Sequence, residues 1–197
     1  AGFSDAVVSM VDGEDEELAA YAEKIHTTSV SAADLIGRVG DLVKTLETED
    51  EPEPRTLDPI LDEVVADVDG KFDDLTVEYA GDPGDCRVYA GDLLDSVFTN
   101  VLSNAAVHTE GAVHVDIYVE EPNPETVVVG FADDGAGVPP DLREDIFEMG
   151  EKGPESDGSG FGLGFVRALT ESYGGRVTVG ESEYGGAEFR MALERAA

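Results

Sequence analysis

The sequence predicts an α+β chain: a two-layer sandwich in which a mixed β-sheet carries helices on one face, preceded by a long helix of a helical hairpin or coiled coil. Three observations predict this class. Two runs of strand-forming residues follow each other closely, at residues 112–120 and 126–132. Shorter strand-like runs alternate with helical segments on either side of them. Ahead of a proline-broken segment near residue 50, apolar residues recur every seven positions.

The first predicted element is a long helix over residues 14–47. This stretch contains no proline, and its apolar seam suits a helical bundle or coiled coil, which requires a partner helix. Apolar residues at helical spacing in residues 3–10 predict the end of that partner, so we expect residues 1–48 to be a dimerisation hairpin whose first helix is truncated. A helix that packs on its own domain is the alternative, because a periodic apolar seam does not show which element covers it.

Residues 49–56, which include the sequence EDEPEP, predict a charged linker, and residues 57–197 predict a separate domain. Its elements, in chain order, are expected to be a helix at 57–68, strands near 76–79 and 87–89, a helix at 91–108, strands at 112–120 and 126–132 joined by EEPNPE, a helix at 162–173, and strands at 176–180 and 187–193.

The composition is strongly acidic, with 45 acidic residues against 12 basic ones and a formal net charge of −33. Such a charge argues against nucleic acid and anionic membranes as direct partners, because both are polyanions. The hydrophobic content of 41% indicates a folded protein with an acidic surface. This pattern resembles proteins of extreme halophiles, whose surface charges are screened over only ~3 Å in molar salt.

Other features of the sequence limit where this chain can act and which chemistry it can carry out. No apolar run is long enough to span a membrane and no export signal is visible, so we expect this chain to act in the cytoplasm, which leaves a membrane anchor elsewhere in the parent protein open. The single cysteine, Cys86, excludes an intrachain disulfide and is expected to be a small core residue. His26 is expected to be a solvated helix residue, and His114, which alternates along a strand, a structural one.

Asn100 and Asn104 lie four positions apart in the apolar helix FTNVLSNAAV, so their side chains share a face. Asparagine is a poor helix former, and two of them in such a helix indicate a polar partner. A magnesium ion that bridges phosphates is one candidate, since an amide oxygen can complete its octahedron. A buried amide network is the other.

The turn DDGAGVP follows the second strong strand. A carboxylate at Asp133 could accept a hydrogen bond from the exocyclic amine of adenine, whereas guanine presents a carbonyl at that position. Gly135 and Gly137 permit a tight turn that lets the ring lie close to the chain. An ordinary turn is the alternative interpretation of this motif when it is taken alone.

The third motif, GSGFGLG, spans residues 158–164 and opens the predicted helix at 162–173. Its alternating glycines let backbone amides approach phosphate oxygens at a helix N-terminus.

The order of these three motifs resembles the ATP-binding catalytic domain of sensor histidine kinases, whose fold is of the Bergerat type. The resemblance covers about residues 57–193 and includes IFEMG at residues 146–150 and GAEF at residues 186–189. It implies the cofactors ATP and Mg²⁺, with Asn104 as the magnesium ligand and Asn100 as its neighbour at the phosphates. Asp133 would bind adenine in a pocket shaped by Gly135 and Gly137. The remaining implied contacts are with the phosphates, beneath a lid at about residues 150–159, and come from Lys152, Gly158, Gly160, Phe161, Gly162 and Leu163.

Asn100 also bears on the branch of this fold. Gyrase-type ATPases, heat-shock chaperones and anti-sigma serine kinases typically carry a glutamate there as general base, and an asparagine cannot take a proton from water or a serine hydroxyl. A neutral histidine ring is already nucleophilic, so Asn100 favours the histidine-kinase branch.

The resemblance therefore implies a kinase core that transfers the γ-phosphoryl group of ATP to a histidine outside this chain and then to a response-regulator aspartate, in a homodimer formed through the N-terminal helices. A nonenzymatic ATP-sensing or dimerisation module is the alternative from a different class, and a hydrolysing ATPase of the same fold is a further one.

Overall fold

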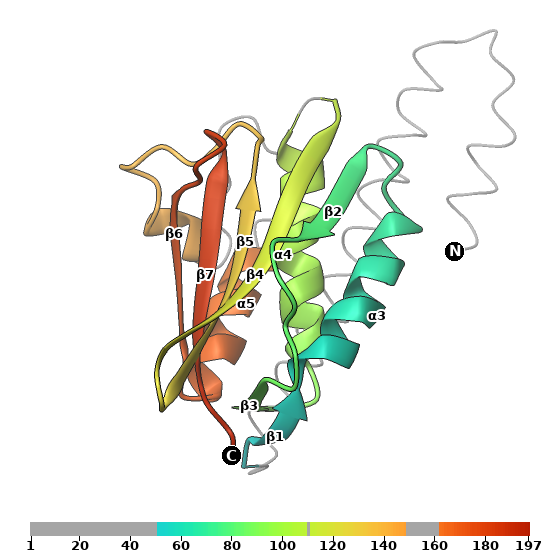
Figure 1. Ribbon diagram of the computed structural model, residues 1–197. Helices are drawn as coiled ribbons and strands as arrows, with labels where there is room; N and C mark the ends of the chain where they lie inside the picture. The colour runs from blue at the N-terminus through green and yellow to red at the C-terminus, as the bar shows by residue number, and fades with distance from the viewer. Residues whose placement is uncertain (1–50, 110, 149–161) are drawn as a thin grey trace, which may run out of the picture. The chain divides into compact units, whose positions relative to one another are not determined.

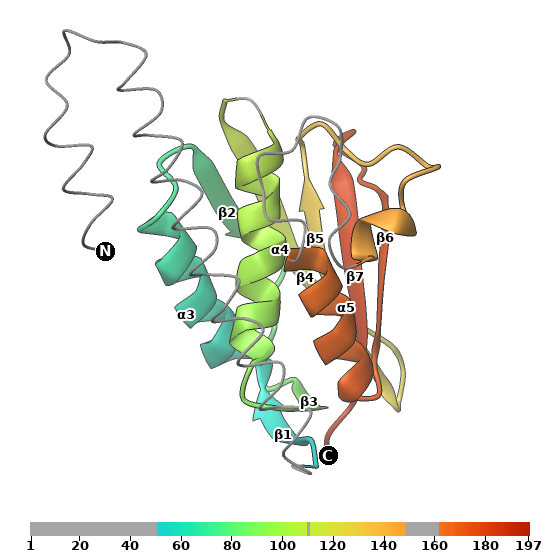
Figure 2. The same cartoon turned by 180° about the vertical axis from the view of Figure 1, so that it is seen from behind.

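A five-stranded mixed β-sheet carries three α-helices on one face in the computed structural model, which describes residues 51–109, 111–148 and 162–197 (Figures 1 and 2). The spatial order of the strands is β2 (Leu75–Tyr79), β4 (Val113–Asn123), β5 (Thr126–Asp133), β7 (Ala187–Glu194) and β6 (Arg176–Glu181). Strand β2 is parallel to β4, and the other neighbouring pairs are antiparallel. The helices are α3 (Leu57–Asp69), α4 (Leu94–His108) and α5 (Gly162–Ser172).

Two smaller features complete the described residues. Strands β1 (Glu53–Thr56) and β3 (Arg87–Ala90) pair antiparallel in a separate two-stranded sheet, and a short 3-10 helix, η1, spans Asp145–Phe147. The predicted α+β class, with a mixed sheet covered by helices on one face, is confirmed. The predicted long helix and hairpin at residues 1–48 lie outside the described residues.

The structure corrects two predicted connections. Residues 53–56 of the predicted linker form β1, where Pro54, which has no N–H, is tolerated because this sheet has only two strands. The predicted loop EEPNPE is mostly strand, because β4 continues to Asn123, whose pairing partner is Thr126. The register shifts between Glu120 and Asn123, and this irregularity absorbs Pro122 into the strand.

The core lies between the sheet and the helices. Alternation along β4 buries Val113, Val115 and Ile117, while the residues between them point to the opposite face, which we call the outer face. At the centre, the rings of Phe98 on α4 and Phe131 on β5 are 5.5 Å apart, and both are at most 1% exposed. Cys86 is also buried, as predicted. None of the helices in the described part of the chain is long and apolar enough to cross a membrane.

Replacing Phe98 by alanine should lower the free energy of unfolding by about 3–5 kcal/mol, because the fully buried ring leaves a cavity against Phe131. Chemical denaturation in molar potassium chloride measures this loss. Val107→Ala is the control on the same helix: its side chain is 52% exposed, so it should change stability little. Equal stability of the Phe98→Ala variant and the parent would contradict this packing.

Candidate functional site

A buried carboxylate marks the end of β5. Asp133 is 6% exposed, and its Oδ1 accepts hydrogen bonds from the backbone N–H of Gly135 at 3.0 Å and of Ala187 at 2.9 Å. Both bonds use the same oxygen, so Oδ2 has no hydrogen-bond partner among the described residues. The carboxylate is thus fixed by the protein through one oxygen and presents the other as an acceptor.

Burial raises the pKa of Asp133, the backbone N–H groups of Ala187 and Gly135 oppose this rise, and the negative charge of Asp134 adds to it. Among the described residues, Oδ2 is not one of the enclosed side-chain atoms that lack a partner, so a donor from outside the protein can reach it. A donor from a ligand at Oδ2 would complete the hydrogen bonds of the carboxylate.

The turn between β6 and β7 holds Asp133 from a second side. The buried hydroxyl of Ser182 donates to the backbone carbonyl of Asp133 and accepts from the N–H groups of Tyr184 and Gly186, each at 3.1 Å. The N–H of Ser182 also donates to the carbonyl of Gly186 at 3.0 Å. Five consecutive turn residues, 182–186, therefore form a rigid support for the carboxylate, which we call the Ser182 turn.

Around Asp133 the chain has glycines at positions where there is no space for a Cβ atom. A Cβ on Gly186 would lie 2.2 Å from Oδ1 of Asp133 and 2.6 Å from the backbone N of Gly135, and a Cβ on Gly135 would lie 2.3 Å from Oγ1 of Thr109. Gly137 has a φ of +70°, which favours glycine. The predicted turn chemistry at Gly137 is therefore present, whereas Gly135 is needed for close approach and not for its backbone angle.

Asn100 and Asn104 both lie on α4, so they share a face of this helix as their spacing predicts. Both are half-buried. Nδ2 of Asn100 donates to the backbone carbonyl of Ser96 at 2.6 Å, so the helix itself satisfies part of this amide. The two oxygens of this pair are hard ligands of the kind that Mg²⁺ takes, so the donor set fits that ion.

Helix α5 begins beside α4 and runs back toward the start of β6, so its N-terminus points to the end of the sheet where β5 ends (Figure 2). Gly162 and Leu163 form its first turn and are half-buried. The other predicted phosphate contacts, Lys152, Gly158, Gly160 and Phe161, and the lid at 150–159 lie outside the described residues. From the IFEMG motif, Phe147 is buried and contacts Phe189 edge to face, with the ring centroids 6.3 Å apart.

The support of the carboxylate is not predictable from the sequence. Ser182 occupies an ordinary turn sequence, ESEYGG, and carried no signal of its own. The GAEF motif is visible in the sequence, but only the fold shows that Gly186 and the N–H of Ala187 contact Asp133, which precedes Ala187 by 54 residues.

Comparisons with known proteins identify the family of this domain. Residues 90–197 match the family model described as histidine kinase-, DNA gyrase B-, and HSP90-like ATPase. The sensor histidine kinase AruS of Pseudomonas aeruginosa is 36% identical over 116 residues, which are 54% of this chain and 12% of AruS. The methanogenesis regulatory histidine kinase FilI of Methanothrix harundinacea is 31% identical over 153 residues, which are 76% of this chain and 16% of FilI.

Among solved structures, the ATP binding domain of PrrB from Mycobacterium tuberculosis superposes with a TM-score of 0.61 at 24% identity, over 76% of this chain and all of that domain. At that identity the likeness concerns the fold. The family model covers more than half of the chain, and the relatives named above are histidine kinases. The chain belongs to the family of histidine kinase-, DNA gyrase B- and HSP90-like ATPases, with sensor histidine kinases among its homologues.

Proposed function

We propose that this chain is the kinase core of a sensor histidine kinase, which binds Mg²⁺ and ATP and transfers the γ-phosphoryl group to a histidine outside this chain and then to a response-regulator aspartate. The observation that carries the proposal is the carboxylate of Asp133, whose Oδ1 is fixed by two N–H groups while Oδ2 has no partner among the described residues.

Asp133 would recognise adenine. Its Oδ2 would accept a hydrogen bond from the exocyclic amine, and Gly135 and Gly137 would let the ring approach the chain. Guanine would present a carbonyl oxygen to the same carboxylate, and two acceptors repel each other. The site would therefore select ATP over GTP, because one buried acceptor would otherwise stay unpaired.

The asparagine pair would serve the phosphates. Asn104 would hold Mg²⁺ through its amide oxygen, beside Asn100, and the bound ion would neutralise the charge of the triphosphate. The remaining contacts, by analogy with the family, would come from the N-terminus of α5 at Gly162 and Leu163, with Gly158, Gly160, Phe161 and Lys152 preceding it.

Asn100 supports transfer to histidine over hydrolysis. An amide cannot remove a proton from water, but a neutral imidazole attacks without a base at this position. One ring nitrogen would bond to the γ-phosphorus as the bond to the leaving oxygen of ADP breaks, and the other ring nitrogen would release its proton to solvent. We further propose that the parent protein is a homodimer joined through helices in residues 1–48. This chain would act in the cytoplasm and bind neither nucleic acid nor membrane directly.

Calorimetric titration with ATP in molar potassium chloride tests the proposal. We expect one ATP per chain, with binding that depends on Mg²⁺ and weakens at least tenfold in Asn104→Ala. Ser103→Ala, a half-buried neighbour on the same helix, is the control and should bind like the parent. Absence of binding by the folded chain would overturn the proposal.

Activity separates the alternatives. When the parent protein is incubated with γ-labelled ATP, we expect an acid-labile, alkali-stable phosphoprotein, as a phosphorylated histidine is. Steady release of phosphate without any phosphoprotein would identify a hydrolysing ATPase. Binding without either product would identify a nonenzymatic ATP-sensing module.

A further inference from the structure

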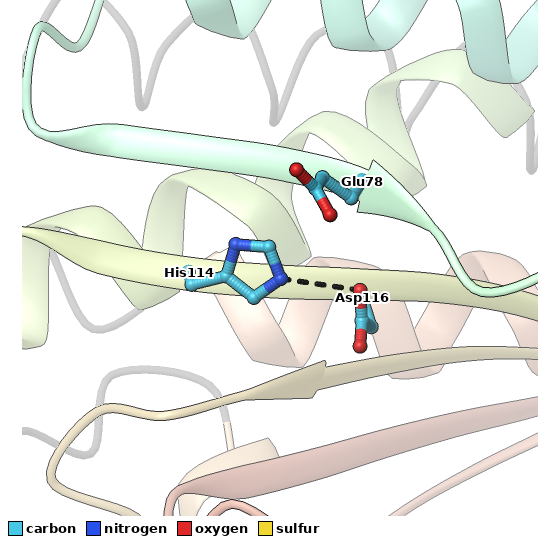
Figure 3. Close-up of side chains that lie close together, drawn as sticks. All are labelled: Glu78, His114 and Asp116. Atoms are coloured by element: carbon cyan, nitrogen blue, oxygen red, sulfur yellow. Dashed lines mark hydrogen bonds and ion pairs between the residues drawn. The ribbon is translucent and has the colours of Figure 1, made fainter.

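Three potential metal ligands meet on the outer face of the sheet. Glu78 lies on β2, and His114 and Asp116 lie two residues apart on β4, so all three side chains stand on the face away from the helices (Figure 3). Each offers one ligand atom, and these atoms lie within 4.8 Å of one another. We call these three residues the outer-face cluster.

The spacing within the cluster fits a single ion. Nε2 of His114 and Oδ1 of Asp116 are 3.2 Å apart. Two ligands bound to one ion at about 2.0–2.2 Å are themselves about 2.8–3.1 Å apart at right angles and about 3.3–3.6 Å apart at tetrahedral angles. Two of the three ligands therefore already have the required separation. Glu78 is exposed, and rotation about its side-chain bonds can bring its carboxylate to the same point.

The charges on this face also favour a cation. Glu78 and Asp116 are direct partners in the register between β2 and β4, so two carboxylates stand opposite each other on neighbouring strands. Two like charges on neighbouring strands repel each other. The guanidinium of Arg190, on the same face, is occupied by Tyr118 and Glu120. A divalent ion between the two carboxylates would replace their repulsion with attraction.

A second layer of contacts orients the ligands. The hydroxyl of Tyr184 donates to Oδ2 of Asp116, which leaves Oδ1 directed at His114. The backbone N–H of His114 donates to Oδ1 of Asp134 at 2.7 Å, which fixes the strand at that residue. Outer contacts of this kind are typical of metal sites, where they fix the orientation of ligating side chains.

We propose that Glu78, His114 and Asp116 bind a divalent transition metal ion of the Zn²⁺ class, with water completing the coordination. The imidazole is the reason for this class, because nitrogen ligands suit Zn²⁺, Ni²⁺ and Cu²⁺, whereas Mg²⁺ and Ca²⁺ take oxygen ligands. None of the three ligands is among the residues proposed to bind ATP, and Val115, between the two β4 ligands, points to the opposite face. The cluster contacts the nucleotide site through Tyr184 of the Ser182 turn and through Asp134, which follows Asp133. The zinc titration is carried out without nucleotide, so its outcome does not depend on ATP binding.

The test is a calorimetric titration of chelator-treated, tag-free protein with zinc chloride. Millimolar magnesium chloride and molar potassium chloride suppress weak binding to the acidic surface. The chain has three histidines, His26, His108 and His114, which allows a matched design. His26→Ala combined with His108→Ala leaves His114 as the sole histidine, and its counterpart is the single variant His114→Ala.

We expect one Zn²⁺ per chain in the parent and in the double variant, and affinity at least tenfold weaker in His114→Ala and in Asp116→Asn. Zinc affinity should also be weaker in Glu78→Gln. This substitution should leave the fold intact, because Glu78 is exposed. Cobalt(II) in place of zinc should give visible absorption bands that disappear with His114→Ala. Zinc affinity unchanged in His114→Ala, or no stoichiometric binding by the parent, would overturn the proposal.

Discussion

Replacing Asp133 by asparagine should weaken ATP binding by about 10- to 150-fold, the range that corresponds to the loss of a hydrogen bond to a charged group. The N–H groups of Gly135 and Ala187 will hold the amide oxygen where they now hold Oδ1. The amide N–H₂ must then take the place of Oδ2, where it meets the exocyclic amine of adenine donor to donor. The same N–H₂ can donate to the carbonyl of guanine, so the preference for ATP over GTP should shrink.

Competition titrations with both nucleotides in molar potassium chloride measure this change. Asp134→Asn is the matched control, because it removes the same negative charge at the next residue. The side chain of Asp134 is exposed, and its Oδ1 accepts a hydrogen bond from the backbone N–H of His114. Equal discrimination between ATP and GTP in Asp133→Asn and in the parent would show that Asp133 does not contact the base.

The same carboxylate gives a pH dependence. Asp133 must be ionised to accept fully from adenine, and burial raises its pKa. ATP affinity should therefore be present above this pKa and fall as the pH drops through it, and the fall should begin at a higher pH than for an aspartate with an ordinary pKa. Calorimetric titrations with ATP over a range of pH measure this fall in affinity. The fall that is due to protonation of Asp133 should be missing in Asp133→Asn.

Replacing Gly186 by alanine should both destabilise the domain and abolish most nucleotide binding. The new Cβ would meet Oδ1 and the backbone carbonyl of Asp133 at 2.2 and 2.4 Å and the backbone N of Gly135 at 2.6 Å. Two of these atoms are backbone, so the Ser182 turn must move away from Asp133. We expect a loss of about 1–3 kcal/mol in the free energy of unfolding, as for overpacked interiors, and ATP binding weakened at least tenfold.

Chemical denaturation and calorimetry on the same samples measure both effects. Gly180→Ala on β6 is the control, because the nearest atom to its new Cβ is Oε2 of Glu188 at 3.9 Å. That variant should retain the stability and the ATP affinity of the parent. Normal ATP binding by Gly186→Ala would mean that the Ser182 turn does not position the carboxylate.

Most of the described elements follow from local sequence. Strand β5 is nearly continuously apolar, and α4 has an apolar face interrupted by Asn100 and Asn104, so the period of each segment predicts its type. The predicted element type was wrong where pairing with a neighbouring strand outweighed the local preference of a proline-containing segment for a loop. Residues around Pro54 and Pro122 look like loops by composition, yet partner strands hold both in sheets.

The class of the fold, the asparagine pair on one helix face and the position of Asp133 at the end of a strand all follow from the amino-acid sequence, because each depends on periodicity or on neighbouring residues. The groups that hold Asp133 and the cluster on the outer face become visible only in the folded chain. Ser182, Gly186 and Ala187 reach Asp133 across about 50 residues, through the antiparallel pairing of β5 with β7. Glu78 meets Asp116 through the parallel register of β2 and β4. Strand register is a long-range property that no local pattern encodes, so these contacts could be found only in the folded chain.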